Sequence, residues 1–158
     1  MELDLKGKSA LITGGSKGIG FATARAFAAE GASLHIAARN TGDLERAREV
    51  IIRDFDVPVA FHAVDLTQGH AVRELAKECA DVDILVNNAG AIPGGSLEDI
   101  DEDRWREMYS DLPGGSAATS EDIANAVAFL ASSRARYISG TVLTIDGGLS
   151  ASQAVVGS

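Results

Sequence analysis

Apolar positions in the first ninety residues form two alternating kinds of segment. Four short runs are continuously apolar, as in strands buried on both faces, and they cover residues 8–13, 33–38, 57–64 and 82–86. Three longer segments repeat apolar residues at helical spacing, and they cover residues 17–30, 41–53 and 67–80. This alternation predicts an α/β fold with a doubly wound parallel sheet in three layers, α/β/α.

Helical spacing returns after residue 117. Thr119 or Ser120 is a suitable N-cap, and acidic residues follow in the first turn, where the helix dipole favours them. The predicted inward positions are Ile123, Ala126, Val127 and Leu130 in this helix, and Ala71, Val72, Leu75 and Ala76 in the segment 67–80. Residues 140–146 are predicted to form a last strand, and 158 residues fit a single domain spanning 1–158.

Composition narrows the classes of partner. The chain carries 14 basic and 23 acidic side chains, a net charge of −9, which disfavours nucleic acid as a partner. No apolar run approaches the roughly 18 residues that span a membrane, and residues 1–8 lack the apolar stretch of a signal peptide. With a single cysteine, no internal disulfide can form, so the expected location is the cytoplasm.

The cysteine and the histidines give no signal of a metal site. Cys79 lies among helix-forming residues and is expected to pack as a small apolar side chain rather than react as a thiol. His35, His62 and His70 are scattered and show no ligand spacing with cysteine or with one another. We therefore predict no metal ligands.

A glycine-rich turn separates the first strand from the first helix. Glycines allow positive φ and leave no Cβ in the way, so a diphosphate could approach the N–H groups at the start of the helix. The predicted contacts are Gly14, Ser16, Lys17, Gly18 and Ile19, with Gly20 packing the helix against the sheet. A plain turn is the alternative. A P-loop is disfavoured because Lys17 precedes Gly18 and no Gly-Lys-Ser/Thr triplet follows.

The end of the second strand carries a cation where many dinucleotide sites carry an acid. Arg39 and Asn40 stand there, and a guanidinium suits a ribose 2′-phosphate, whereas a carboxylate would favour a free 2′-hydroxyl. Lys17 in the glycine turn could add a second positive charge. This pattern favours NADP(H) over NAD(H), unless both cations are solvated surface charges.

Several motifs, in order, resemble those of the classical short-chain dehydrogenases/reductases. They are Thr13-Gly14-x-x-x-Gly18-x-Gly20, Asp65-Leu66, Asn87-Asn88-Ala89-Gly90, and Ser139-Gly140 with Asp146-Gly147-Gly148. The resemblance covers residues 3–109 and 117–150. It implies a Rossmann-like fold, NADP(H) as coenzyme, hydride transfer to or from a small carbonyl or secondary alcohol, and a homodimer or homotetramer when the protein is intact.

The resemblance also assigns roles beyond the glycine turn. Asp65 and Leu66 are expected to contact adenine, although Asp65 could instead cap the next helix, as could Thr67. Asn87 and Asn88 are expected to bind backbone and brace neighbouring strands, while Ala89 and Gly90 leave room for a ribose. A plain turn is the alternative reading of this second motif.

The catalytic centre implied by the resemblance is missing. The family uses a tyrosine followed four residues later by lysine, but Pro113 and Thr141 follow Tyr109 and Tyr137 at that distance. No catalytic residue can therefore be assigned. We expect a seam near residues 109–117, where the family would hold two more strands and the catalytic helix, so the fold should be incomplete.

Three explanations of the seam are open. The sequence could omit residues of a longer protein, carry an internal deletion, or belong to a binding module with a rearranged sheet. Three functions are also open: an NADP(H)-dependent oxidoreductase in the intact protein, with the 158 residues alone inactive; a non-catalytic NADP(H)-binding module; or an inactive fragment.

Overall fold

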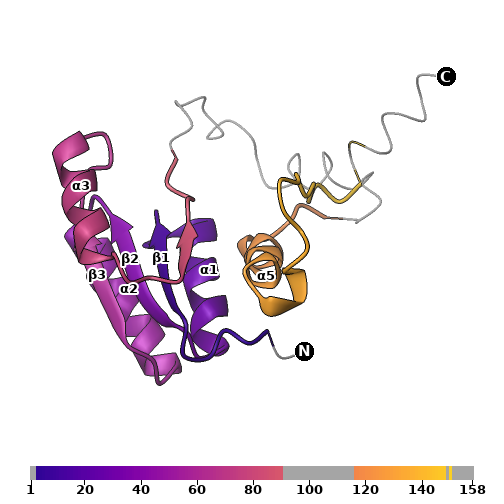
Figure 1. The fold of residues 1–158 in the computed structure, drawn as a ribbon, viewed down its shortest axis with the longest axis horizontal. Helices are drawn as coiled ribbons and strands as arrows, with labels where there is room; N and C mark the ends of the chain where they lie inside the picture. Colours follow the sequence, from indigo (N-terminus) through magenta and orange to yellow (C-terminus); the bar gives the residue numbers. More distant parts are fainter. Residues whose placement is uncertain (1–2, 91–115, 149, 151–158) are drawn as a thin grey trace.

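Four parallel strands form the centre of the computed structural model, which describes residues 3–90, 116–148 and 150 (Figure 1). The strands are β1 (Ser9–Thr13), β2 (Ser33–Ala38), β3 (Val59–Ala63) and β4 (Ile84–Val86), and their order in the sheet is β3-β2-β1-β4. All three pairings are parallel, so the carboxyl ends of the strands lie at one edge. The predicted parallel sheet is confirmed, although β3 and β4 each begin two residues later than expected.

Helices cover both faces of the sheet. They are α1 (Gly18–Ala29), α2 (Thr41–Asp54), α3 (Gly69–Glu78) and α5 (Ser120–Leu130), and a short 3₁₀ helix, η2, covers Ser133–Ala135. Side chains of α1, α2 and α5 share one core with Ile12 of β1 and Ile36 of β2. On the other face of the sheet, α3 packs against the adjacent strand residues, Leu11 and Ala37. Because successive strand residues face opposite sides, the predicted three layers are confirmed.

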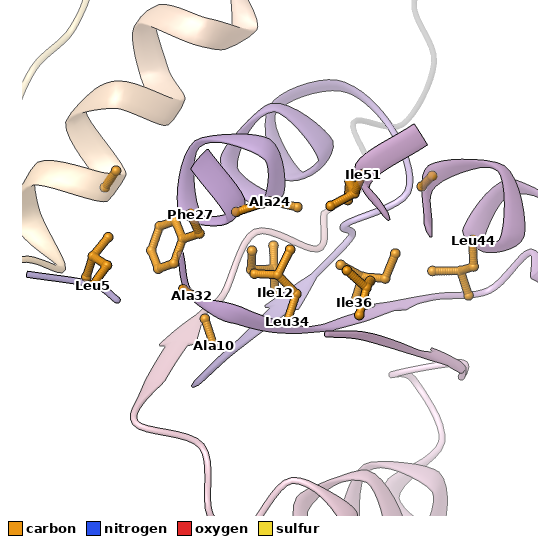
Figure 2. Close-up of a cluster of buried hydrophobic side chains, with 14 residues drawn as sticks. Leu5, Ala10, Ile12, Ala24, Phe27, Ala32, Leu34, Ile36, Leu44 and Ile51 are labelled. Carbon is orange, nitrogen blue, oxygen red and sulfur yellow. The ribbon is translucent and has the colours of Figure 1, made fainter. Parts of the chain in front are cut away.

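The main core lies between the sheet and the α1–α2 layer (Figure 2). Phe27 and Ala24 of α1 and Ile51 of α2 point toward Ile12 and Ile36 on the strands, and all five side chains are fully buried. In α2 the apolar residues recur at helical spacing, and Asn40 caps the helix by accepting a hydrogen bond from the Asp43 N–H at 2.9 Å. This layer holds the strands whose ends form the site.

Helix α5 lies beside α1, but a different stripe of it is buried than predicted (Figure 1). Ala124 and Ala128 are buried, Val127 packs on the core, and Leu130 remains 37% exposed. Small alanines allow the two helices to approach closely, so they take the contact in place of the larger residues. Of the two candidate caps, Thr119 is the one used, and it forms a reciprocal capping box with Asp122.

Two further predictions are wrong, and both concern surfaces that lack neighbours among the described residues. Residues 141–145 form no strand, and Val142 is 91% exposed. On α3, Val72 and Ala76 are exposed and Leu75 alone is buried. A strand needs an adjacent ladder and an apolar helix face needs a covering layer, and the described structure supplies neither here.

Helix α1 starts very close to the turn that follows β1. A Cβ on Gly20 would stand 2.2 Å from the Gly14 carbonyl oxygen and 2.5 Å from Nδ2 of Asn88. Only glycine fits this contact. The prediction that Gly20 lets the helix pack closely is confirmed.

Two adjacent isoleucines of α2 test the core. Ile51 is 0% exposed and Ile52 is 42% exposed. We expect Ile51→Ala to lower the free energy of unfolding by about 2–5 kcal/mol, because it removes buried methyl groups and leaves a cavity. Ile52→Ala, the matched control, should change it by less than about 0.5 kcal/mol. Urea denaturation measures both, and equal losses would contradict the core described here.

Two helical glycines test the close approach of α1. Gly20→Ala should lower the free energy of unfolding by about 1–3 kcal/mol or more, because backbone must move to admit the methyl group. Gly42→Ala is the control, since its Cβ would meet atoms no nearer than 3.5 Å. It should be neutral or stabilise α2 by up to about 1 kcal/mol. A Gly20→Ala protein as stable as the parent in urea would refute the tight contact.

Candidate functional site

A cleft of about 770 Å³ lies at the carboxyl edge of the sheet, lined by the segments that follow all four strands. Eleven of the thirteen residues predicted from the sequence to contact a coenzyme line it: Gly14, Ser16, Lys17, Ile19, Arg39, Asn40, Asp65, Leu66, Asn88, Ala89 and Gly90. The fold therefore brings residues from four separate loops to one place. This is the position where ligands bind in open α/β sheets.

The two remaining predicted residues, Gly18 and Gly20, shape the cleft without lining it. Gly18 has a φ of +55°, which favours glycine. A Cβ there would meet no atom within 4 Å, so the backbone at this point faces open space. Gly20 is buried behind the turn.

The start of α1 leaves backbone donors available to the cleft. The N-cap residue, Lys17, makes no side-chain cap bond, and no acidic residue lies in the first turn. The first N–H groups of any helix lack partners within it, and the helix dipole adds positive potential there. This end of α1 can hold an anion such as a diphosphate.

A hydrogen-bond network centred on Thr13 fixes the floor of the cleft. The Thr13 hydroxyl donates to the Val86 carbonyl oxygen at 3.2 Å and accepts from the N–H groups of Asn88 and Ala89, each at 3.0 Å. The Asn88 amide donates to the Thr13 carbonyl oxygen at 3.0 Å and to that of Gly14 at 3.4 Å. The prediction that Asn88 braces neighbouring strands is confirmed. The role of Thr13 was missed, because its hydroxyl is coupled to residues about 75 positions away.

Lys17 is already paired, whereas the sequence predicts a free cation here. Its ammonium lies 2.8 Å from a carboxylate oxygen of Asp43, and Arg46 contacts the other oxygen. The hydrogen bond from Lys17, more than any other influence, lowers the pKa of Asp43, so this carboxylate stays ionised at neutral pH. Asp43 also lines the cleft and places a negative charge within it.

Arg39 and Asp65 face the cleft from the ends of β2 and β3. Asp65 accepts hydrogen bonds from the N–H and the hydroxyl of Thr67, at 3.0 and 2.9 Å. These bonds lower its pKa, and the positive charge of Arg39 adds to the effect. Neither Asp65 nor Thr67 caps α3, whose N-cap is Gln68 without a side-chain bond. Arg39 is exposed and forms no salt bridge with any described residue, so its guanidinium is available to an anion.

The sequence predicts that the histidines are scattered, without metal-ligand spacing to the cysteine. This prediction is wrong for His35, His62 and Cys79, which lie together. Potential ligand atoms of His35, His62 and Cys79 lie within 4.8 Å of one another, because parallel strands and a helix bring them to one face of the sheet. His70 lies apart from this group and is exposed. Cys79 is buried and packs on Leu75 as predicted.

Among the described residues, no helix has the length and hydrophobicity needed to cross a bilayer.

Comparisons with known proteins point to one family. The family model described as short chain dehydrogenase matches residues 8–112, and that described as enoyl-(acyl carrier protein) reductase matches residues 107–150. Sorbose reductase sou1 of Schizosaccharomyces pombe is 43% identical in an alignment of 113 positions that covers 66% of this chain and 43% of that protein. The 2-dehydro-3-deoxy-D-gluconate 5-dehydrogenase of Bacillus subtilis is 35% identical over 109 residues, covering 67% and 42%. The chain thus spans less than half the length of these curated relatives.

Solved structures similar to this chain include members of the same family. A short chain dehydrogenase/reductase family protein superposes with a TM-score of 0.78 at 27% identity, covering 96% of this chain and 100% of that one. L-Sorbose reductase from Gluconobacter frateurii, complexed with NADPH and L-sorbose, gives a TM-score of 0.57 at 30% identity, covering 82% and 47%. Because the first family model matches more than half of the chain, and the parallel sheet and glycine turn agree with it, the chain belongs to the short chain dehydrogenase family.

Proposed function

We propose that the chain is the coenzyme-binding part of an NADP(H)-dependent oxidoreductase, and that the 158 residues bind the coenzyme without turning it over. The observation that carries this proposal is the cleft, in which the uncapped start of α1 and the guanidinium of Arg39, which forms no salt bridge with a described residue, offer donors for two anionic groups at adjacent strand ends. A dinucleotide with a phosphorylated ribose has two such anionic groups. Bound NADP(H) would supply the hydride; the protein supplies position and electrostatics.

The lining residues fit such a coenzyme by their chemistry. The first-turn N–H groups of α1 and the turn at Gly14 suit a diphosphate, and Arg39 suits a 2′-phosphate. Asp65 keeps a carboxylate that can accept from an adenine amino group, with Leu66 beside it. Asn88 is committed to the strands, while Ala89 and Gly90 add little bulk where the opposite ribose is expected.

The seam near residues 109–117 is part of the same proposal. The two family models meet at residues 107–112, and the chain spans 43% of its sorbose reductase relative. The predicted last strand does not form, and Leu85 on β4 is 55% exposed. Two strands and a catalytic helix inserted at the seam would supply neighbours for these segments and the missing tyrosine and lysine.

We propose further that an intact protein of this kind acts on a small carbonyl compound or secondary alcohol in the cytoplasm, as a homodimer or homotetramer. Relatives named as sorbose reductase, 2-dehydro-3-deoxy-D-gluconate 5-dehydrogenase and D-beta-hydroxybutyrate dehydrogenase support the carbonyl and alcohol class. Their substrates differ, so the support extends to the class of chemistry.

Calorimetry with NADPH and NADH tests the binding site. We expect the 158-residue chain to bind NADPH more tightly than NADH, and Arg39→Ala to weaken NADPH binding about 10- to 100-fold, as expected when a charged hydrogen bond is lost. NADH affinity should stay nearly unchanged, because NADH has no 2′-phosphate.

Arg73→Ala is the matched control, since Arg73 is an exposed arginine of α3 that does not line the cleft. It should leave both affinities unchanged. An equal loss for NADPH and NADH in Arg39→Ala would remove the 2′-phosphate assignment. If the chain is folded by circular dichroism but neither coenzyme gives a heat of binding, the binding proposal is refuted. The chain would then be an inactive fragment.

A substitution of Asp43 is expected to strengthen NADPH binding, the opposite of the effect expected for Arg39→Ala. Its carboxylate holds Lys17 and adds negative charge to the cleft. Asp43→Asn should therefore strengthen NADPH binding severalfold, because it frees Lys17 and removes repulsion of the phosphates. Glu45→Gln, the same change of charge on the exposed surface of α2, should have little effect. Weaker NADPH binding by Asp43→Asn in the same calorimetric titration would show that the lysine–aspartate pair supports the site instead.

A further inference from the structure

Three side chains meet beneath α3, on the face of the sheet opposite α1. Nδ1 of His35 lies 3.0 Å from Nε2 of His62, and Sγ of Cys79 lies 3.5 Å from the first and 3.6 Å from the second of these nitrogens. The cluster is outside the coenzyme cleft, since none of the three residues lines it. Nothing in the proposed function accounts for it.

The sheet explains why the two histidines share a face. His62 on β3 is paired with Ala37 on β2, and Ala37 lies two residues beyond His35. Residues two apart on a strand point the same way, so both imidazoles emerge on the side that α3 covers. Their rings stack with centroids 5.3 Å apart and an interplanar angle of 14°. Cys79, the C-cap residue of α3, reaches them from that helix.

The spacing of the three atoms suits one bound ion. A triangle with sides of 3.0, 3.5 and 3.6 Å has a centre about 2.0 Å from each corner. Zinc binds imidazole nitrogen at about 2.0–2.1 Å and thiolate sulfur at about 2.3 Å, so an ion slightly out of the plane reaches all three. The three ligand atoms are therefore close enough to share one ion, once the two rings turn their nitrogens from each other toward it.

Glu78 orients one ligand toward that point. A carboxylate oxygen of Glu78 lies 3.0 Å from Nδ1 of His62. A carboxylate can only accept a hydrogen bond, so we assign the proton of the neutral ring to Nδ1, which leaves the lone pair of Nε2 facing His35 and Cys79. A carboxylate behind a histidine is the usual support of a metal-bound imidazole.

We propose that His35, His62 and Cys79 form a binding site for one zinc-like transition-metal ion, with water as the fourth ligand and Glu78 as a positioning residue. Two imidazoles and a thiolate favour borderline or soft ions, whereas magnesium and calcium prefer oxygen ligands. Because Leu75 alone is buried along α3, the ion would fasten this helix to β2 and β3.

Binding requires a change of protonation at two ligands. Burial, followed by the nearby His62, lowers the pKa of His35, so its ring is neutral at pH 7 and must move its remaining proton to Nε2. Burial raises the pKa of the Cys79 thiol, so the sulfur is protonated before binding. The ion forms one bond to sulfur and two to nitrogen, and the thiol proton leaves to solvent.

Cobalt(II) is the probe, added under reducing conditions to the 158-residue chain without a histidine tag. We expect one equivalent to bind with a thiolate-to-cobalt absorption band, and zinc to abolish the band by displacement. Cys79→Ser should remove the band, and His62→Gln should weaken binding by at least about 10-fold. Glu78→Gln should weaken it about 10- to 100-fold, as outer-shell changes do. His70→Gln, the control at an exposed histidine, should match the parent.

Absence of a thiolate band in the parent chain would overturn the proposal and leave a hydrogen-bonded polar cluster. Equal cobalt affinity in His62→Gln and His70→Gln would overturn it as well. If circular dichroism shows that Cys79→Ser does not fold, the test rests on the absorption band of the parent chain and on His35→Gln. Weaker cobalt binding by His35→Gln would then support the site. A second readout is the melting temperature, which should rise with zinc in the parent but not in His35→Gln. NADPH calorimetry is separate, so failure here leaves the coenzyme proposal standing.

Discussion

The contact between the start of α1 and the turn after β1 determines the geometry of the whole cleft. Gly20 lies against the carbonyl oxygen of Gly14, and Asn88 fills the space beside both. Thr13 then joins the ends of β1 and β4 through its hydroxyl. These short contacts leave no room for a side chain at Gly20 and aim the uncapped end of α1 at the cleft. The proposed anion site therefore depends on this packing.

Charge in the cleft is a balance rather than a simple positive patch. Arg39 lines the cleft and forms no salt bridge with any residue that the structure describes, whereas Lys17 is held by Asp43, which also contacts Arg46. In a chain with a net charge of −9, the anion sites depend on single side chains whose neighbours can cancel them. The proposed preference for a phosphorylated ribose would therefore rest on Arg39 as long as Asp43 holds Lys17. Under that proposal, Arg39 and Asp43 would act on coenzyme choice in opposite directions.

The sequence predicted the features that depend on residues close together in the chain. The four strands, the glycine turn and the loops lining the cleft follow from apolar runs and helical spacing, so most of the fold and eleven residues of the cleft could be located. Pairings across long sequence distances could not be found in this way. Thr13 with Asn88, and His35 with His62, depend on sheet order and register. The stripe of α5 centred on Ala124 was missed because close helix packing favours small residues over large ones.

The described residues differ in how completely their apolar side chains and backbone groups find partners. Around β1 and β2 the core is closed by α1, α2 and α5, with Ile12, Ile36 and Ile51 fully buried. Leu85 on β4 stays exposed, and residues 141–145 remain without a strand. A backbone ladder cannot form without an adjacent strand, however apolar the sequence, and residues 3–90 and 116–148 supply none beside 141–145. The same apolar pattern therefore gives a strand at residues 33–38 and none at 141–145, because strand formation is decided by the partner as much as by the segment.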